Sequence, residues 1–270
     1  MSVQYKTILV HCSKKGRDTM KKVVIMESLG ISEQELAAFE APFANEVSFE
    51  HFAKTTDKDK LIDEAKDADA MIIANMPMPA DVIRACDKLQ FIDVAFTGVD
   101  HVGLDAAREK GIKVSNASGY SNEAVSELVI GMALSMMRNI VATQERVRSG
   151  GTKDGLVGCE LKGKTVGIIG YGKIGSRTGE LMHAFGCKVL AQCRSKHDDL
   201  PAWVEQVSQD ELLAQSDIVV LHCPLNDSTR GMIDYGKLSL MKKTALLINV
   251  ARGPVTNEDD LARALKEGVS

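Results

Sequence analysis

The segment Thr165 to Gly175, TVGIIGYGKIG, constrains the fold of this chain more than any other. A run of apolar residues, Val166 to Ile169, leads directly into the pattern Gly-x-Gly-x-x-Gly, whose glycines are Gly170, Gly172 and Gly175. Apolar residues then recur at helical spacing. The order of strand, glycine turn and helix is that of a βα unit that binds the pyrophosphate of a dinucleotide.

Each glycine has a separate role in this interpretation. Gly170 permits a tight turn, Gly172 lets the backbone approach the phosphates, and Gly175 lets the helix pack closely on the strand. The N-terminus of the helix then directs its amides at the anion. The alternative is a glycine turn with only a structural role, but the strand and helix on either side favour binding.

Composition and charge limit the possible functions. The chain has 270 residues, of which 44% are hydrophobic and 26% charged, which is typical of a soluble globular protein with two domains. The net charge of −4 leaves no surplus of basic residues to replace the counterions of nucleic acid. The longest apolar stretch, Ala124 to Met137, is too short to span a bilayer, and no secretory signal opens the chain. We therefore expect neither nucleic acid nor a membrane as a partner.

The cysteines are scattered without a C-x-x-C pair, and the histidines do not lie at ligand spacing from them. We therefore expect free thiols in a reducing, cytoplasmic compartment and no metal site. The six cysteines are Cys12, Cys86, Cys159, Cys187, Cys193 and Cys223.

Strand and helix patterns alternate from Lys21 onward, which predicts the α/β class with two doubly wound sheets of parallel strands. The first helix begins with the capping box Ser32-x-x-Glu35. Residues 1–19 are either an added edge strand or an extension before Met20, where the sequence reads like a natural start. Strands are expected at 23–26, 47–52, 70–74, 91–95, 165–169, 188–193, 217–222 and 245–250. Helices are expected at 32–39, 59–66, 80–87, 173–185, 208–215, 235–241 and 257–267.

One long helix is expected over residues 121–149, where apolar residues repeat at alternating spacings of three and four. Gly150 and Gly151 end it. The apolar stripe is most simply core, but a helix of this length can also pair with its copy, which predicts a homodimer. The stripe consists of Val125, Leu128, Val129, Met132, Ala133, Met136, Met137, Ile140 and Val141.

The end of the strand 188–193 bears on the choice of dinucleotide. An acid there normally accepts hydrogen bonds from the ribose hydroxyls of NAD, but Cys193 is followed by Arg194, Ser195 and Lys196. These side chains can bind a 2′-phosphate through charge-assisted hydrogen bonds. We expect a preference for NADP(H), with NAD(H) possible; the alternative is a solvated basic loop without a role in selectivity.

Arg252 follows the strand 245–250, and ligands of open α/β sheets lie outside the carboxyl ends of the strands. A planar cation at this position can hold a substrate carboxylate and polarise the adjacent carbonyl. Such an arginine is otherwise a surface ion pair. The glycine turn and a second loop, Phe96 to Asp100, which can present backbone amides to an anion, favour the binding role.

At this point the residues resemble the D-isomer-specific 2-hydroxyacid dehydrogenases, most closely the glycerate dehydrogenase and hydroxypyruvate reductase members. The match runs from about Met20 to Ser270. It rests on the segments FTGVDHVGLDAAREKGIKVSNASGYSNEAVSE, ELKGKTVGIIGYGKIG, SDIVVLHCPLNDSTRGMID and LLINVARGPVTNEDDL. Together these segments are far more specific than the glycines alone.

The resemblance implies a flavodoxin-like substrate domain, or lid, at residues 1–118, a Rossmann domain at 119–270, and an active site in the cleft between them. Arg252 falls on the family's catalytic arginine. The segment Met76 to Pro79 would line the substrate pocket, and its Pro and Met residues suggest a small, rather apolar pocket. The substrate carboxylate would be bound by backbone amides of Thr97, Gly98 and Val99.

The resemblance also assigns the cofactor site. His222 lies on the strand-end motif LHCPL, which is not the position of the family's catalytic histidine, so we expect it beside the adenosine half. The cofactor-binding residues are expected to be Gly170, Tyr171, Gly172, Lys173, Ile174, Gly175, Cys193, Arg194, Ser195, Lys196, His222, Cys223, Pro224, Thr229, Val250, Ala251 and Arg252.

One departure from the family's pattern concerns the proton donor. In the family, a glutamate and then a histidine follow the arginine, and both would lie beyond Ser270. We expect the chain to be part of a longer enzyme that reduces a small 2-keto acid such as glyoxylate or hydroxypyruvate. The alternatives are a cofactor-sensing binding protein of the corepressor type and an inactive fragment.

Overall fold

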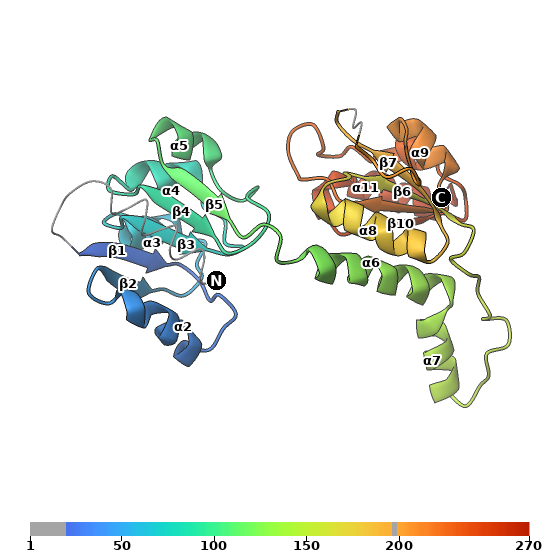
Figure 1. The fold of residues 1–270 in the computed structure, drawn as a ribbon, viewed down its shortest axis with the longest axis horizontal. Helices are drawn as coiled ribbons and strands as arrows, with labels where there is room; N and C mark the ends of the chain where they lie inside the picture. The colour runs from blue at the N-terminus through green and yellow to red at the C-terminus, as the bar shows by residue number, and fades with distance from the viewer. Residues whose placement is uncertain (1–19, 196–198, 270) are drawn as a thin grey trace. The chain divides into compact units, whose positions relative to one another are not determined.

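The computed structural model of the chain describes residues 20–195 and 199–269. It divides into two compact units, Met1–Tyr120 and Ser121–Ser270, where the sequence places the boundary after residue 118. Each unit is built around its own five-stranded parallel sheet, which confirms the expected α/β class (Figure 1). The segment 1–19, the subject of the edge-strand alternative, lies outside the described residues, as does Lys196.

The first unit contains a sheet with the strand order β2-β1-β3-β4-β5, which is that of the flavodoxin-like fold. Apolar side chains from α3, α4 and α5 pack on one face of this sheet, and side chains from α2 pack on the other. The expected capping box of α2 is present: the Ser32 hydroxyl accepts from the backbone of Glu35, whose carboxylate accepts from the backbone of Ser32. The elements are β1 (Lys21–Ile25), α2 (Glu33–Glu40), η1 (Ala41–Phe43), β2 (Val47–His51), α3 (Lys58–Ala65), β3 (Ala70–Ile73), α4 (Ala80–Ala85), β4 (Phe91–Val94), α5 (Leu104–Glu109) and β5 (Lys113–Asn116).

The second unit contains a sheet with the order β10-β9-β6-β7-β8. Numbered from its own first strand, this is the 3-2-1-4-5 order of a Rossmann sheet read from the other edge. The elements are α6 (Asn122–Met137), α7 (Ile140–Arg148), β6 (Thr165–Ile169), α8 (Lys173–Ala184), β7 (Lys188–Gln192), β8 (Val204–Gln206), α9 (Gln209–Gln215), β9 (Ile218–Leu221), α10 (Tyr235–Leu238), β10 (Leu246–Asn249), η2 (Gly253–Val255) and α11 (Glu258–Glu267).

The single helix expected over 121–149 is wrong, because α6 and α7 meet at a bend of 57°. Asn139 lies between them in the left-handed region, with φ of 51°, and asparagine tolerates this conformation better than most residues. The carbonyl oxygen of Met137, freed by the break, accepts a hydrogen bond from the backbone of Cys159 at 2.8 Å. The loop that contains Cys159 therefore provides a hydrogen-bond donor for a carbonyl at the C-terminal end of α6. Gly158 permits the close approach of this loop, because an added Cβ would lie 2.1 Å from the Met137 carbonyl oxygen.

The apolar stripe of this helix pair is only partly core. Val129, Ala133 and Met137 are buried against the second sheet. The other face of the pair leaves large apolar side chains exposed, namely Leu128, Met132, Met136, Ile140, Val141 and Val147.

Candidate functional site

The glycine turn lies at the carboxyl end of the central strand of the second sheet. β6 has β7 on one side and β9 on the other, so the strand order reverses at this strand. Dinucleotides bind open α/β sheets at such a reversal, outside the carboxyl ends of the strands. The expected cofactor residues that the structure describes follow β6, β7, β9 and β10, so the fold gathers them along one edge of one sheet.

The three glycines differ in the space around them. Gly170 has φ of 96°, and an added Cβ would lie 2.6 Å from the backbone nitrogen of Cys223. An added Cβ on Gly175 would lie 2.3 Å from the carbonyl oxygen of Gly170, so only glycine allows α8 to approach the turn this closely. A Cβ on Gly172 would meet no atom of the described chain within 4 Å. The backbone at Gly172 is therefore open to a ligand.

The N-terminus of α8 has donors to offer to an anion. Gly172 occupies the N-cap position, and within residues 20–195 and 199–269 no side chain caps this helix. The first turn of a helix has no internal carbonyl partners for its amides, and the first bond here runs from the Ser176 amide to the Gly172 carbonyl at 2.7 Å. Lys173 adds an exposed cation at the same end. These features fit a pyrophosphate.

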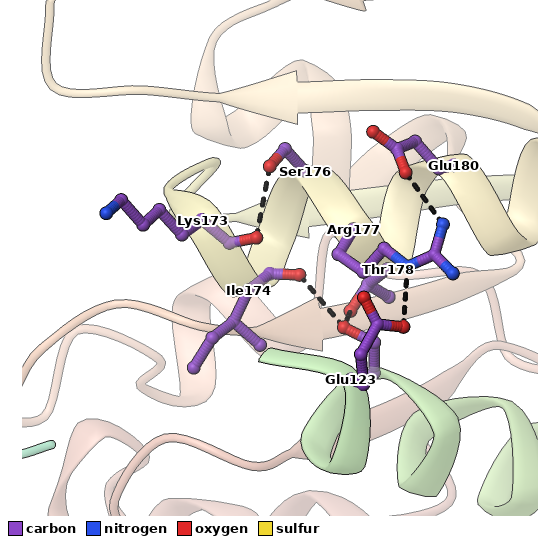
Figure 2. A network of polar contacts seen from close by, with 8 residues as sticks. Glu123, Lys173, Ile174, Ser176, Arg177, Thr178 and Glu180 are labelled. Atoms are coloured by element: carbon purple, nitrogen blue, oxygen red, sulfur yellow. Dashed lines mark hydrogen bonds and ion pairs between the residues drawn. The ribbon is translucent and has the colours of Figure 1, made fainter. Parts of the chain in front are cut away.

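Figure 2 shows how the first turns of α8 are fastened to the start of α6. Arg177 donates to Glu123 at 2.8 Å and to Glu180 at 2.9 Å on the exposed side. On the buried side, the Thr178 hydroxyl donates to the Ser126 hydroxyl at 3.1 Å. Ser126 in turn donates to the carbonyl oxygen of Ile174 at 3.2 Å. The helix that would bind the phosphates is therefore held at its first two turns.

His222 extends the buried side of this network. Its Nε2 atom lies 3.0 Å from the Thr178 hydroxyl oxygen, and burial lowers the pKa of His222 to about 4. The ring is therefore neutral at pH 7. Because Thr178 donates to Ser126, a proton on Nε2 would complete the chain of hydrogen bonds. This arrangement gives His222 a structural contact with Thr178.

The end of β7 carries no carboxylate in the next three residues, Cys193 to Ser195. Arg194 and Ser195 are exposed, and the Ser195 carbonyl accepts a hydrogen bond from Gln206 at 2.9 Å. Tyr171, in the middle of the glycine turn, folds back over α8, since an added Cβ on Gly179 would lie 3.0 Å from its ring. Burial raises the pKa of Tyr171 to about 12.

The loop after β9 is shaped by Thr229. Its hydroxyl donates to the Pro224 carbonyl at 2.7 Å and accepts from the Asn226 amide at 2.9 Å. Cys223 is buried against Gly170, and Pro224 is exposed. The Thr229 hydroxyl therefore stabilises the loop conformation. This gives Thr229 a structural role that does not depend on a ligand.

Arg252 is half-buried at the carboxyl end of β10. Asn249 holds it there: its side chain donates to the Arg252 carbonyl at 2.9 Å and accepts from the Ala251 amide at 3.0 Å. Arg252 itself donates from Nη1 to the Ala251 carbonyl at 3.0 Å. The role of Asn249 was not predicted from the sequence, although an asparagine before a turn is a local signal for this kind of contact.

In the first unit, backbone hydrogen bonds join the segment expected to line the substrate pocket to residues just after the loop expected to bind the carboxylate. The Met78 amide donates to the His101 carbonyl, and the Gly103 amide donates to the Met78 carbonyl, both at 2.8 Å. Gly103 permits this approach, because an added Cβ would lie 2.6 Å from the backbone nitrogen of Ala80. The segments after β3 and β4 therefore form one connected edge, where the sequence analysis treated them separately.

The side chain of Met76 differs from expectation. Met76 and Met78 are fully buried in the core of the first unit, so neither side chain is available to line a pocket. Asn75 and Pro77 are the exposed members of this segment. Any substrate contact here would come from their side chains or from the backbone.

The loop 97–99 lies half-exposed, with Val99 packed against the core. Asn116, at the end of β5, donates to the carbonyl oxygen of Thr97 at 2.6 Å. Glu27, after β1, accepts from the backbone amides of Ala74 and Met76. Both side chains were missed from the sequence because their partners lie 19 to 49 residues away.

Metal and membrane features were also sought in the described residues. Among residues 20–195 and 199–269, no group of three or more His, Cys, Asp and Glu residues is arranged to hold a metal ion. Within the same ranges, no single helix has the length and apolar content to cross a membrane, although the bent pair α6 and α7 meets these criteria when taken together. The five cysteines in these ranges have free thiols, as expected.

Comparisons with known proteins agree with this geometry. The family model for the D-isomer specific 2-hydroxyacid dehydrogenase, NAD binding domain, matches residues 130–270. The chain is 36% identical over 221 residues to the hydroxypyruvate reductase of Blautia hydrogenotrophica, covering 79% of this chain and 69% of that protein. The first curated relatives that it matches are covered over 65% to 69% of their length.

Two solved structures are similar over most of the chain. A glyoxylate reductase from Paecilomyes thermophila superposes with a TM-score of 0.82 and 28% identity, covering 93% of this chain and 79% of that one. An acyclic imino acid reductase in complex with NADPH and D-Arg superposes with a TM-score of 0.83 and 27% identity, covering 92% of this chain and 80% of that one.

Proposed function

Because this chain belongs to the D-isomer specific 2-hydroxyacid dehydrogenase family, we propose that the protein transfers a hydride between a nicotinamide dinucleotide and a small 2-keto or D-2-hydroxy acid. The proposal rests on the N-terminus of α8. Its amides have no side-chain cap among the described residues, and the space beside Gly172 at the N-cap position holds no described atom within 4 Å of an added Cβ. The substrate class, glyoxylate or hydroxypyruvate, follows from the names of similar proteins.

The residues have distinct roles in this proposal. The α8 amides and Gly172 would hold the pyrophosphate. The loop Thr97 to Val99 would bind the substrate carboxylate through backbone amides, and Arg252 would polarise the keto carbonyl. Bound there, a reduced dinucleotide would supply a hydride to the keto carbon of a 2-keto acid, and an oxidised one would accept a hydride from C2 of a 2-hydroxy acid.

Reduction of a ketone also needs a proton at the keto oxygen, and a positioned donor is typically worth about 10²–10⁴ in rate. His222 does not fit this role, since burial lowers its pKa to about 4 and its Nε2 lies against Thr178. Since no proton donor is assigned among the described residues, ligand binding tests the proposal more directly than turnover.

We further propose that NADP(H) is preferred. Arg194 and Ser195 are exposed after β7, and no carboxylate stands at 193–195 to repel a 2′-phosphate. One similar structure is a complex with NADPH. The free thiols favour a cytoplasmic protein, and the exposed apolar face of α6 and α7 favours a homodimer.

Fluorescence titration with NADPH and NADH tests the cofactor proposal. We expect NADPH to bind more tightly, and Arg194→Glu to weaken NADPH binding about tenfold, the size of one charge-assisted contact, with little effect on NADH. Lys243→Glu is the matched control, because Lys243 is exposed and precedes β10, at the opposite edge of the sheet.

The substrate arm of the test adds hydroxypyruvate to the protein saturated with NADP⁺. We expect Arg252→Ala to weaken hydroxypyruvate binding and leave NADP⁺ affinity within a few-fold. Equal affinities for NADPH and NADH would contradict the preference alone. Failure of the protein to bind either dinucleotide would contradict the proposed function itself.

A further inference from the structure

We propose that Glu27 is a positioning residue that sets the conformation of the substrate-binding edge in the first unit. This inference rests on the proposed function only for the identity of the ligand. Glu27 follows β1 at the carboxyl edge of the sheet, and it is one of few charged residues buried in the described part of the chain, with 5% of its surface exposed.

One carboxylate oxygen of Glu27 holds the segment after β3. Oε1 accepts from the backbone amide of Ala74 at 2.8 Å and from that of Met76 at 2.5 Å. These two amides flank Asn75. The carboxylate therefore hydrogen-bonds the backbone on both sides of Asn75, which is exposed.

A buried carboxylate is costly unless it is hydrogen-bonded and its charge is balanced. The two amides provide the hydrogen bonds, and charge-assisted bonds of this kind are stronger than neutral ones. The second oxygen, Oε2, lies 3.6 Å from the ammonium of Lys54, whose side chain is about half exposed. Glu27 is thus stabilised from both sides while it fixes the loop.

The consequence extends beyond Asn75. Met76 and Met78 are anchored in the core, and Met78 is hydrogen-bonded to the backbone of His101 and Gly103. The segment held by Glu27 is therefore bonded to residues 101 and 103, and the Val102 amide between them donates to the Val99 carbonyl of the loop proposed to bind the carboxylate at 3.1 Å. Loss of the Glu27 hydrogen bonds would free Asn75 and Pro77 and loosen this shared edge.

The competing explanation is that Glu27 only stabilises the fold of the first unit. Two substitutions separate the explanations. Glu27→Gln keeps a carbonyl oxygen that can accept both amides, whereas Glu27→Ala removes the acceptor. Glu50→Ala is the matched control, because Glu50 also lies in the first unit but has a side chain that is 43% exposed and paired at 2.9 Å with Lys22.

The experiment measures hydroxypyruvate binding to the NADP⁺-saturated protein by calorimetry, together with NADP⁺ affinity and amide hydrogen exchange of residues 74–78. We expect Glu27→Ala to weaken hydroxypyruvate binding about tenfold, consistent with the loss of charge-assisted hydrogen bonds. NADP⁺ affinity should stay unchanged, and exchange at 74–78 should accelerate. Glu27→Gln should restore most of the binding, and Glu50→Ala should behave as the parent protein.

Three results would overturn the inference. Unchanged hydroxypyruvate binding by Glu27→Ala would remove the positioning role. An equal loss of hydroxypyruvate affinity in Glu27→Gln and Glu27→Ala would show that substrate binding depends on the charge of Glu27 and not on its hydrogen bonds to the loop. If the parent protein binds NADP⁺ but no hydroxypyruvate, the proposed substrate is wrong. In that case the inference about Glu27 is tested by hydrogen exchange alone, and unaltered amide exchange at 74–78 in Glu27→Ala would overturn it.

Discussion

Gly172 and Gly175 are three residues apart, yet a methyl group added to each has a different expected effect. Gly172 faces open space and its φ of −89° suits any residue, so Gly172→Ala should leave the unfolding temperature unchanged and weaken dinucleotide binding by blocking the phosphates. Gly175→Ala should lower both the unfolding temperature and the affinity for the dinucleotide, because its Cβ would lie 2.3 Å from the Gly170 carbonyl oxygen.

Thermal unfolding and NADPH titration of the two variants test this distinction. Gly131→Ala is the control, since Gly131 is an exposed position in α6 with no described atom within 4 Å of an added Cβ. It should leave dinucleotide affinity unchanged and should not lower the unfolding temperature, because alanine favours a helix more than glycine does. Dinucleotide affinity that survives in Gly172→Ala would mean that the turn does not carry the phosphates.

His222 makes a second prediction at this scale, concerning pH. A histidine in the unfolded chain takes up a proton below about 6.5, whereas burial lowers the pKa of His222 in the fold to about 4. The folded state therefore loses stability as the pH falls from about 6.5 to about 4, by roughly 3 kcal/mol at most. The contribution is constant above and below this window.

The variant His222→Gln should lose less stability than the parent between pH 7.5 and pH 4.5, measured as the change in calorimetric unfolding temperature. At pH 7.5 the variant should itself be less stable, because glutamine must replace a buried hydrogen bond to Thr178. Identical pH dependence in the two proteins would show that His222 titrates near its ordinary value.

The contacts of single side chains divide into those that local sequence predicts and those that it does not. The Ser32 capping box and the glycine turn depend on residues within one or two helical turns, and the sequence predicted both. Glu27 bonds to amides 47 and 49 residues away, and only the pairing of β1 with β3 brings them together. No local pattern marks such a residue.

At the scale of elements, burial decided what the sequence could predict. Strands β3, β4 and β9 are buried along their whole length; β3 and β9 appear as continuous apolar runs, and β4 is interrupted only by Asp93. The edge strands β5 and β8, KVSN and VEQ, are short and mostly polar, and both were missed. The six-residue helix α5 was also missed.

The break between α6 and α7 shows a further limit. The apolar spacing continues across Asn139, so periodicity alone predicted one helix. The bend depends on the Met137 carbonyl finding the Cys159 amide, 22 positions later in the chain. When a distant loop donates the hydrogen bond to the last carbonyls of a helix, the spacing of apolar residues does not indicate where that helix ends.

At the scale of the whole molecule, the exposed face of α6 and α7 predicts self-association. Met136 is 50% exposed within a run of apolar side chains, so Met136→Glu should shift the protein from dimer to monomer at micromolar concentration in analytical ultracentrifugation. Leu265→Glu, a change at an equally apolar position that is 62% exposed on α11, should leave the dimer intact. A monomeric parent protein would contradict the proposed dimer.

The fastening of α6 to α8 has a mechanical consequence. α6 is the first helix after Tyr120, and its opening turns are tied to the start of α8 through Glu123 and Ser126 (Figure 2). Tension along the peptide that leaves the first unit is therefore delivered to the turn that would hold the phosphates. The connecting peptide, α6 and α8 are linked in series, and elements in series carry the same force.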